Sequence, residues 1–178
     1  VGIQKEVELT TSEGSLFRGN STATKLMSAF TRLTGRHYLQ STLRELLSQV
    51  QNHPYGYEVD PTKAKVEDVQ VNMYHLLQTS KQFLDRIISS LPFCPPAFRY
   101  MARILRAEVC QRFPEAKYSS VGGFLFLRFF CPAILAPESC GLSLVGVPDP
   151  KTRRPLVLIA KVLQNLSNNV RFGGKEAF

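Results

Sequence analysis

The chain has 178 residues, 44% of them hydrophobic, which is enough for one globular domain with a sizeable core. Its formal net charge of +8 favours a negatively charged partner. The basic residues are scattered, which argues against a nucleic-acid-binding segment, and an acidic protein surface or an anionic membrane fits the charge equally well. The 4 cysteines form no Cys-x-x-Cys pair and stand apart from the 3 histidines, which argues against a zinc site and favours reduced thiols in a cytosolic protein.

Hydrophobic spacing of three and four residues predicts helices along most of the chain. Asp60 followed by Pro61 resembles an N-cap and the first residue of a helix. The stretch 138–155 is rich in proline and is predicted to be an irregular surface loop. The apolar faces occupy residues 23–33, 39–50, 69–91, 98–109, 119–130 and 156–170, and the predicted breaks fall at Gly35, 52–56, Pro92, Pro132 and Pro137.

The segment 119–130 is apolar on nearly all sides, as in a buried strand or a buried helix. No other segment shows the alternation that partner strands need, so we interpret it as the buried central helix of an all-α, multi-helix domain. Arg128 is the only charged residue between Lys117 and Glu138. It is expected to bind carbonyl oxygens of another segment, because a guanidinium in apolar surroundings needs acceptors. The alternative is an arginine at the helix edge with its head in water.

A second arginine stands in a short segment near the N-terminus. Leu16 and Phe17 can anchor a loop by burying apolar area, and Gly19 gives the backbone freedom just after Arg18. Asn20 or Ser21 is a suitable N-cap for the helix that follows. These residues predict a loop that is held on both sides and presents Arg18. The alternative is an ordinary solvated surface arginine.

Three segments, in this order, resemble the catalytic domain of the Ras GTPase-activating proteins. The run 16–20, Leu-Phe-Arg-Gly-Asn, resembles the arginine-finger loop of that family, although Ser15 stands where many relatives have threonine. The run 126–133 resembles its signature, Phe-Leu-Arg followed by three residues and Pro-Ala, and a third match covers 160–168 and 172–176. The resemblance runs from about Leu16 to the last residue, so it covers nearly the whole of residues 1–178. Because family domains extend beyond both ends with extra helices, we expect a core fragment of a larger protein.

The resemblance implies roles for individual residues. Arg18 matches the finger that enters the active site of the GTPase, and Arg128 matches a second arginine that fixes the finger loop. Leu127 is implied to be an apolar contact for the GTPase, beside Leu16, Phe17 and Gly19 of the loop. The remaining matches are polar groove residues that dock the GTPase or support the finger, for which ordinary solvated surface is the alternative; they are Lys161, Gln164, Asn168, Lys175 and Glu176.

The implied function is activation of GTP hydrolysis by a Ras-type small GTPase in its GTP-bound form, with Ras and Rap both open as substrates. Such a protein is no enzyme by itself, because it contributes a catalytic arginine to its partner, and the resemblance implies no cofactor and no metal. We expect it in the cytoplasm, at the inner face of membranes where the GTPase is anchored, with only indirect membrane contact. Two alternatives are a scaffold that binds the GTPase without activating it and a basic helical nucleic-acid binder.

Overall fold

The protein consists of α-helices joined by 3₁₀ turns and irregular segments, in a computed structural model that describes residues 2–142 and 149–170. The described residues contain no strand, which confirms the all-α prediction. The α-helices are α1 (Gly2–Leu9), α2 (Thr22–Thr34), α3 (Arg36–Asn52), α4 (Val66–Ser89), α5 (Pro96–Arg112), α6 (Ser119–Leu125), α7 (Cys131–Leu135) and α8 (Pro150–Ser167). The 3₁₀ turns are η1 (Glu13–Ser15), η2 (Leu91–Phe93), η3 (Pro114–Ala116) and η5 (Pro137–Cys140).

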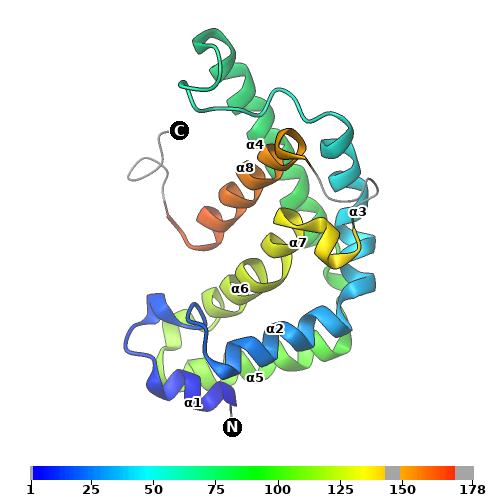
Figure 1. The fold of residues 1–178 in the computed structure, drawn as a ribbon. Helices are drawn as coiled ribbons and strands as arrows, with labels where there is room; N and C mark the ends of the chain where they lie inside the picture. The colour runs from blue at the N-terminus through cyan, green and yellow to red at the C-terminus, as the bar shows by residue number, and fades with distance from the viewer. Residues whose placement is uncertain (1, 143–148, 171–178) are drawn as a thin grey trace.

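The core is divided into two hydrophobic clusters, which the central segment joins. In Figure 1, α6 and α7 run between a layer formed by α3, α4 and α8 and a layer formed by α1, α2 and α5. Phe124 packs in the cluster of the second layer, whereas Phe129 and Phe130 pack in the cluster of the first. Leu125 contacts both clusters. The prediction of a buried central helix is therefore confirmed, and this helix fixes the two layers relative to each other.

The central segment contains one wide turn, η4 (Phe126–Phe130), with π-helical hydrogen bonding between α6 and α7. The amide of Cys131 donates to the carbonyl of Phe126, five residues earlier. Pro132 was predicted to end the helix, and this is wrong because the helix continues to Leu135. Pro132 lies in the first turn of α7, where a residue without an amide hydrogen is tolerated. Turns of this kind are frequent at functional sites, and Arg128 lies in the middle of this one.

Two further boundaries differ from the prediction. The Asp60 carboxylate accepts hydrogen bonds from the amide and hydroxyl of Thr62, so it stabilises a turn, and α4 begins later, at Val66. The last helix begins within the predicted loop, because the carboxylate of Asp149 accepts a hydrogen bond of 2.7 Å from the amide of Thr152 and caps α8. Acidic N-caps satisfy amides that the first helical turn leaves unpaired.

The long apolar face predicted for residues 69–91 is only partly buried. Leu76 and Ile87 belong to the core, as does Phe83, whereas Met73, Leu77 and Ile88 are exposed. The reason is that α4 packs mainly against α3 and α8, so only one side of the helix meets other elements of the described chain. Amphipathic spacing alone does not measure how wide the buried side of a helix is.

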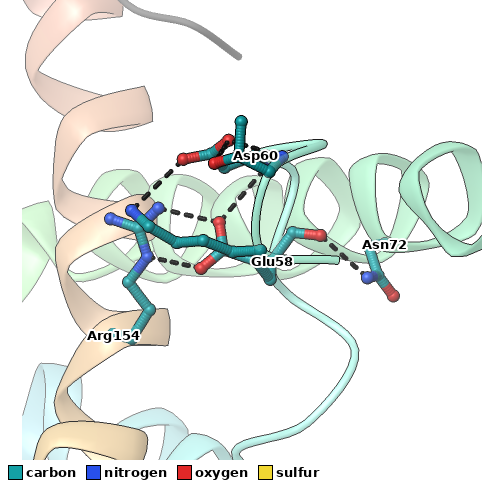
Figure 2. A network of polar contacts seen from close by, with 6 residues as sticks. Glu58, Asp60, Asn72 and Arg154 are labelled. Carbon is teal, nitrogen blue, oxygen red and sulfur yellow. Dashed lines mark hydrogen bonds and ion pairs between the residues drawn. The ribbon is translucent and has the colours of Figure 1, made fainter. Parts of the chain in front are cut away.

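A polar network ties α8 to the segment before α4 (Figure 2). Arg154 of α8 donates to both carboxylate oxygens of Glu58, with nitrogen–oxygen distances of 2.7 Å for each bond. The carbonyl of Glu58 accepts a hydrogen bond of 2.8 Å from the side chain of Asn72 in α4. The hydrogen bonds from Arg154 hold the pKa of the Glu58 carboxyl below its usual value. The bidentate pair of Arg154 with Glu58, together with the bond from Asn72, holds the first half of α8 near α4.

Gly35 joins α2 to α3, and it is required for space rather than for backbone freedom. The predicted break at Gly35 is confirmed, and its φ of −102° is accessible to any residue. A Cβ atom at this position would lie 2.5 Å from the rings of Phe98 and Phe129. The close approach of these rings to the backbone therefore excludes a side chain here.

Substitution Gly35→Ala is expected to destabilise the fold by roughly 1–3 kcal/mol, because the added methyl must displace two buried rings. Gly122→Ala is the matched control, since nothing lies within 4 Å of its added Cβ. In the α6 helix that change should be neutral or stabilise by up to about 1 kcal/mol. Urea unfolding of both variants and the parent measures the difference, and equal midpoints for all three would contradict the packing argument.

Candidate functional site

The Arg18 loop, residues 16–20, lies between η1 and α2 and is held by two buried side chains. Leu16 and Phe17 pack in the same cluster as α1 and α5. The Phe17 ring, only 1% exposed, meets the Phe124 ring edge-on, with centroids 6.4 Å apart. Arg18 follows directly and is exposed. The loop thus has the two apolar anchors that the sequence predicted, and they leave Arg18 at the surface.

The unusual backbone conformation of this loop lies at Phe17. Its φ of 55° falls in the left-handed region, which a bulky residue rarely adopts and which costs on the order of 1–3 kcal/mol. Gly19, in which the sequence placed the backbone freedom, does not have a positive φ. The turn is closed by a hydrogen bond of 3.2 Å from the amide of Arg18 to the carbonyl of Ser15. The strained residue is thus the buried anchor that immediately precedes Arg18.

The far end of the loop is held by the start of α2. Ser21 is the N-cap, and its hydroxyl accepts a hydrogen bond of 3.1 Å from the amide of Thr24. The buried Thr24 hydroxyl donates to the carbonyl of Gly19 over 2.8 Å. Of the two N-caps that the sequence allowed, the structure therefore uses Ser21, and Asn20 is available for another contact.

Arg128 holds the loop from the central helix. One terminal nitrogen, Nη2, lies 2.6 Å from the carbonyl oxygen of Arg18, 2.7 Å from that of Gly19 and 3.4 Å from that of Phe17. The other, Nη1, donates to the side-chain oxygen of Asn20 over 3.0 Å. The expectation that Arg128 binds carbonyl oxygens of another segment is confirmed. The segment it binds is the Arg18 loop, more than 100 residues away in the sequence.

A cavity of about 420 Å³ opens beside the loop, between η1, the start of α6 and the end of α8. It brings together five of the residues singled out in the sequence, from three distant segments. These are Leu16, Phe17, Arg18, Leu127 and Asn168. The buried side-chain oxygen of Asn168 and the hydroxyl of Ser120, which also lines the cavity, have no hydrogen-bond partner within the described part of the chain. The cavity is thus partly polar and borders Arg18 directly.

The other candidates on α8 lie near the cavity but do not line it. Lys161 and Gln164 are half-buried on the helix that ends at Ser167. Lys161 lies two turns and Gln164 one turn before the Asn168 that lines the cavity. Val170, which was predicted to belong to the apolar face of this helix, is exposed and lies beyond its end. Lys175 and Glu176 lie outside the described residues.

Sequence reasoning missed two residues that shape the loop. Asn20 was considered only as an N-cap, yet its side chain accepts a hydrogen bond from Arg128. Thr24 is fully buried and bonds the carbonyl of Gly19. The sequence held a signal for each residue. Asn20 and Ser21 are both N-cap candidates, and because only one can cap the helix, the other is available for another contact. Thr24 lies three residues after Ser21, so its hydroxyl can face back toward the loop.

Other kinds of site find no basis in the described residues. In 2–142 and 149–170, no three His, Cys, Asp or Glu side chains gather in a way that could hold a metal ion. Burial raises the pKa of the Cys131 thiol to about 12, so this cysteine is a core residue and not a nucleophile. None of the described helices has the length and apolar character that a membrane crossing requires.

Comparison with known proteins identifies the family. The family model described as GTPase-activator protein for Ras-like GTPase matches residues 2–70 and 62–168. "Probable Ras GTPase-activating-like protein ngap" of Dictyostelium discoideum is 42% identical over 172 residues, which cover 94% of this chain and 20% of that protein. "Ras GTPase-activating protein 1" of Homo sapiens is 32% identical over 178 residues, with coverage of 98% and 17%. The chain belongs to the RasGAP family and spans about a fifth of the length of these relatives.

The contacts of the two arginines predict that replacing Arg128 destabilises the protein and that replacing Arg18 does not. Arg128→Ala should lower the free energy of unfolding by about 1–3 kcal/mol, because carbonyl groups of the loop lose their donor. Arg18→Ala should leave it nearly unchanged, since the Arg18 side chain is exposed and makes no hydrogen bond or ion pair within the described residues. Melting curves of both variants and the parent measure this difference. An Arg128→Ala protein that melts like the parent would show that the loop does not need this arginine.

Proposed function

We propose that this chain accelerates GTP hydrolysis by a Ras-type small GTPase in its GTP-bound form, by inserting Arg18 into the active site of that partner. The single observation that carries the proposal is an exposed arginine on a loop whose backbone is fixed by a second arginine. Membership of the RasGAP family supports the same reaction. The protein would act in the cytoplasm, at the membrane face where such a GTPase is anchored.

The chemistry of GTP hydrolysis explains the need for an arginine. Negative charge on the phosphoryl oxygens must be stabilised in the transition state, and catalysis is mainly positioning and electrostatic stabilisation. An arginine finger supplied in trans is known to contribute roughly 10³ to 10⁵ in rate to small GTPases. A guanidinium suits this role better than an ammonium, because its planar fork can bind two oxygens at once.

In this mechanism Arg128 is a positioning residue, which holds the loop backbone and does not itself reach the phosphate. Leu127 lies in the same wide turn, immediately before Arg128, and lines the cavity beside Arg18, so we assign it an apolar contact to the GTPase. We assign docking of the switch regions to the end of α8, with Asn168 at the cavity and Lys161 and Gln164 behind it. We assign the same docking role to Lys175 and Glu176, and for these two residues the family resemblance is the only support.

The alternative is a scaffold that binds the GTP-loaded partner without activating it. A scaffold has no use for an arginine at the finger position. Here Arg18 is present and exposed, and its loop is bonded through the carbonyls of Phe17, Arg18 and Gly19. Activation therefore has the stronger support.

Arg18→Ala should reduce stimulated GTP hydrolysis on the order of 10³-fold while binding to the GTP-loaded partner is largely retained. Arg18→Lys should be nearly as inactive, because the charge remains but the planar fork is lost. Single-turnover hydrolysis by a panel of small GTPases, with and without each variant, measures the effect. Lys25→Ala, an exposed basic residue on α2, is the control for a general loss of charge. Near-parental activity of Arg18→Ala would exclude the finger role.

Binding should strengthen greatly when the partner carries GDP with aluminium fluoride, which mimics the planar phosphoryl group of the transition state. An activator binds the transition state more tightly than the ground state, and the gain should disappear in Arg18→Ala. Isothermal titration with the fluoride form and with a non-hydrolysable GTP analogue compares the two states. Equal affinities for the parent protein would favour the scaffold.

A further inference from the structure

The outer side of α5 carries a basic stripe that the proposed function does not use. Arg99, Arg103 and Arg106 follow one another at spacings of four and three, so they share one side of the helix. The opposite side is buried in the core through Phe98, Met101, Leu105 and Val109. Lys117 lies just beyond the end of the helix and, with these three arginines, makes up what we call the α5 basic stripe.

No ion pair within the described residues neutralises the positive charge of the stripe. None of its four cations has a carboxylate within ion-pair distance in residues 2–142 and 149–170, whereas the ion pairs that are present involve other elements. Arg99 donates to the carbonyls of Cys94 and Pro92, each over 3.0 Å, and these neutral acceptors leave its charge intact. The stripe therefore presents a local excess of positive charge along α5.

Exposed apolar and aromatic side chains flank this charge at both ends. At one end Leu91 and Phe93 of η2 are 59% and 78% exposed, beside the carbonyls that Arg99 binds. At the other end the exposed Tyr118 ring lies under two cations, 5.8 Å from the Arg106 guanidinium and 5.5 Å from the Lys117 ammonium. Large apolar side chains at the rim of a basic surface are costly in water and suit a partner that is both anionic and apolar.

We propose that the α5 basic stripe and its apolar rim bind the surface of an anionic lipid bilayer. Basic residues near such a surface are attracted to its headgroups, while aromatic and apolar side chains enter the interfacial region. The phosphate backbone of a nucleic acid would satisfy the arginines, but it offers no apolar phase for Leu91 and Phe93. The net charge left an anionic membrane open as a partner, whereas the family resemblance implied only indirect membrane contact. The proposal goes beyond that implication, because helical spacing places the arginines of the stripe on one side of α5.

The stripe and the cavity beside Arg18 use different side chains. None of Arg99, Arg103, Arg106 and Lys117 lines that cavity, so membrane binding and partner binding do not compete for the same residues. The inference is independent of the proposed function, because it needs no GTPase. If both hold, the bilayer concentrates the protein on the surface where its partner is anchored.

Flotation with vesicles of phosphatidylcholine, alone or mixed with phosphatidylserine, tests the inference on the intact chain. The parent should bind only the mixed vesicles, and binding should weaken as salt rises. Arg103→Glu combined with Arg106→Glu should weaken it by about tenfold or more. The same charge change at the exposed Arg32 and Arg44, on α2 and α3, is the matched control and should have a much smaller effect.

Phe93→Ser separates the apolar contribution to vesicle binding from the electrostatic one. It removes an apolar side chain without changing the net charge, so it should weaken vesicle binding even at high salt. Circular dichroism checks that each variant is folded, and GTP hydrolysis with a soluble GTPase should be unaffected by the stripe variants. Absence of binding to the mixed vesicles would overturn the inference. So would equal losses in the stripe and control variants, or tighter binding to a DNA duplex than to vesicles at the same salt concentration.

Discussion

The hydrogen bonds from Arg128 to the carbonyls of residues 17–19 are the interaction on which the geometry of this site depends. The left-handed conformation of Phe17 costs on the order of 1–3 kcal/mol. Burial of its side chain returns a similar amount, about 1.5–3 kcal/mol, so the anchor alone barely balances the strain. Bonds from a charged donor, each on the order of 1.5–3 kcal/mol, decide the balance. Without Arg128 the loop would keep its anchor but lose what holds its carbonyls in place.

Arg128 can perform this task because of where the central helix places it. The helix joins both hydrophobic clusters, through Phe124 on one side and Phe129 on the other, so its orientation is fixed by most of the core. The wide turn of η4 lies between these two anchors and contains Arg128. Because the helix that carries it is fixed in the core, the Arg128 guanidinium has little freedom to move with the Arg18 loop. The position of the Arg18 loop is thus set by the packing of the whole domain, although the loop itself lies at the surface.

Much of the fold and of the Arg18 site could be predicted from the sequence, and each prediction that was wrong has a physical cause. Arg128 was predictable because a lone charge in an apolar run has few stable solutions, and carbonyl acceptors are one of them. The helix start predicted at Asp60 was wrong because a carboxylate can also stabilise a turn, here by accepting hydrogen bonds from Thr62, two residues later. The strain at Phe17 was hidden, since glycine is the usual left-handed residue and Gly19 stood nearby. The cavity depends on the three-dimensional approach of η1, α6 and α8, which no local pattern encodes.

The two arginines have the same chemistry, and their surroundings give them different tasks. Arg128 uses both terminal nitrogens within the protein, so it is already ordered. Arg18 has its backbone fixed and its side chain exposed. In the proposed function, ordering that side chain in a partner costs up to about 2 kcal/mol of conformational entropy. If Arg18 were bonded internally, each broken bond would add about 1.5–3 kcal/mol to that cost. A fixed backbone with an exposed side chain therefore combines accurate placement with a low cost of transfer, and it requires that another residue hold the loop.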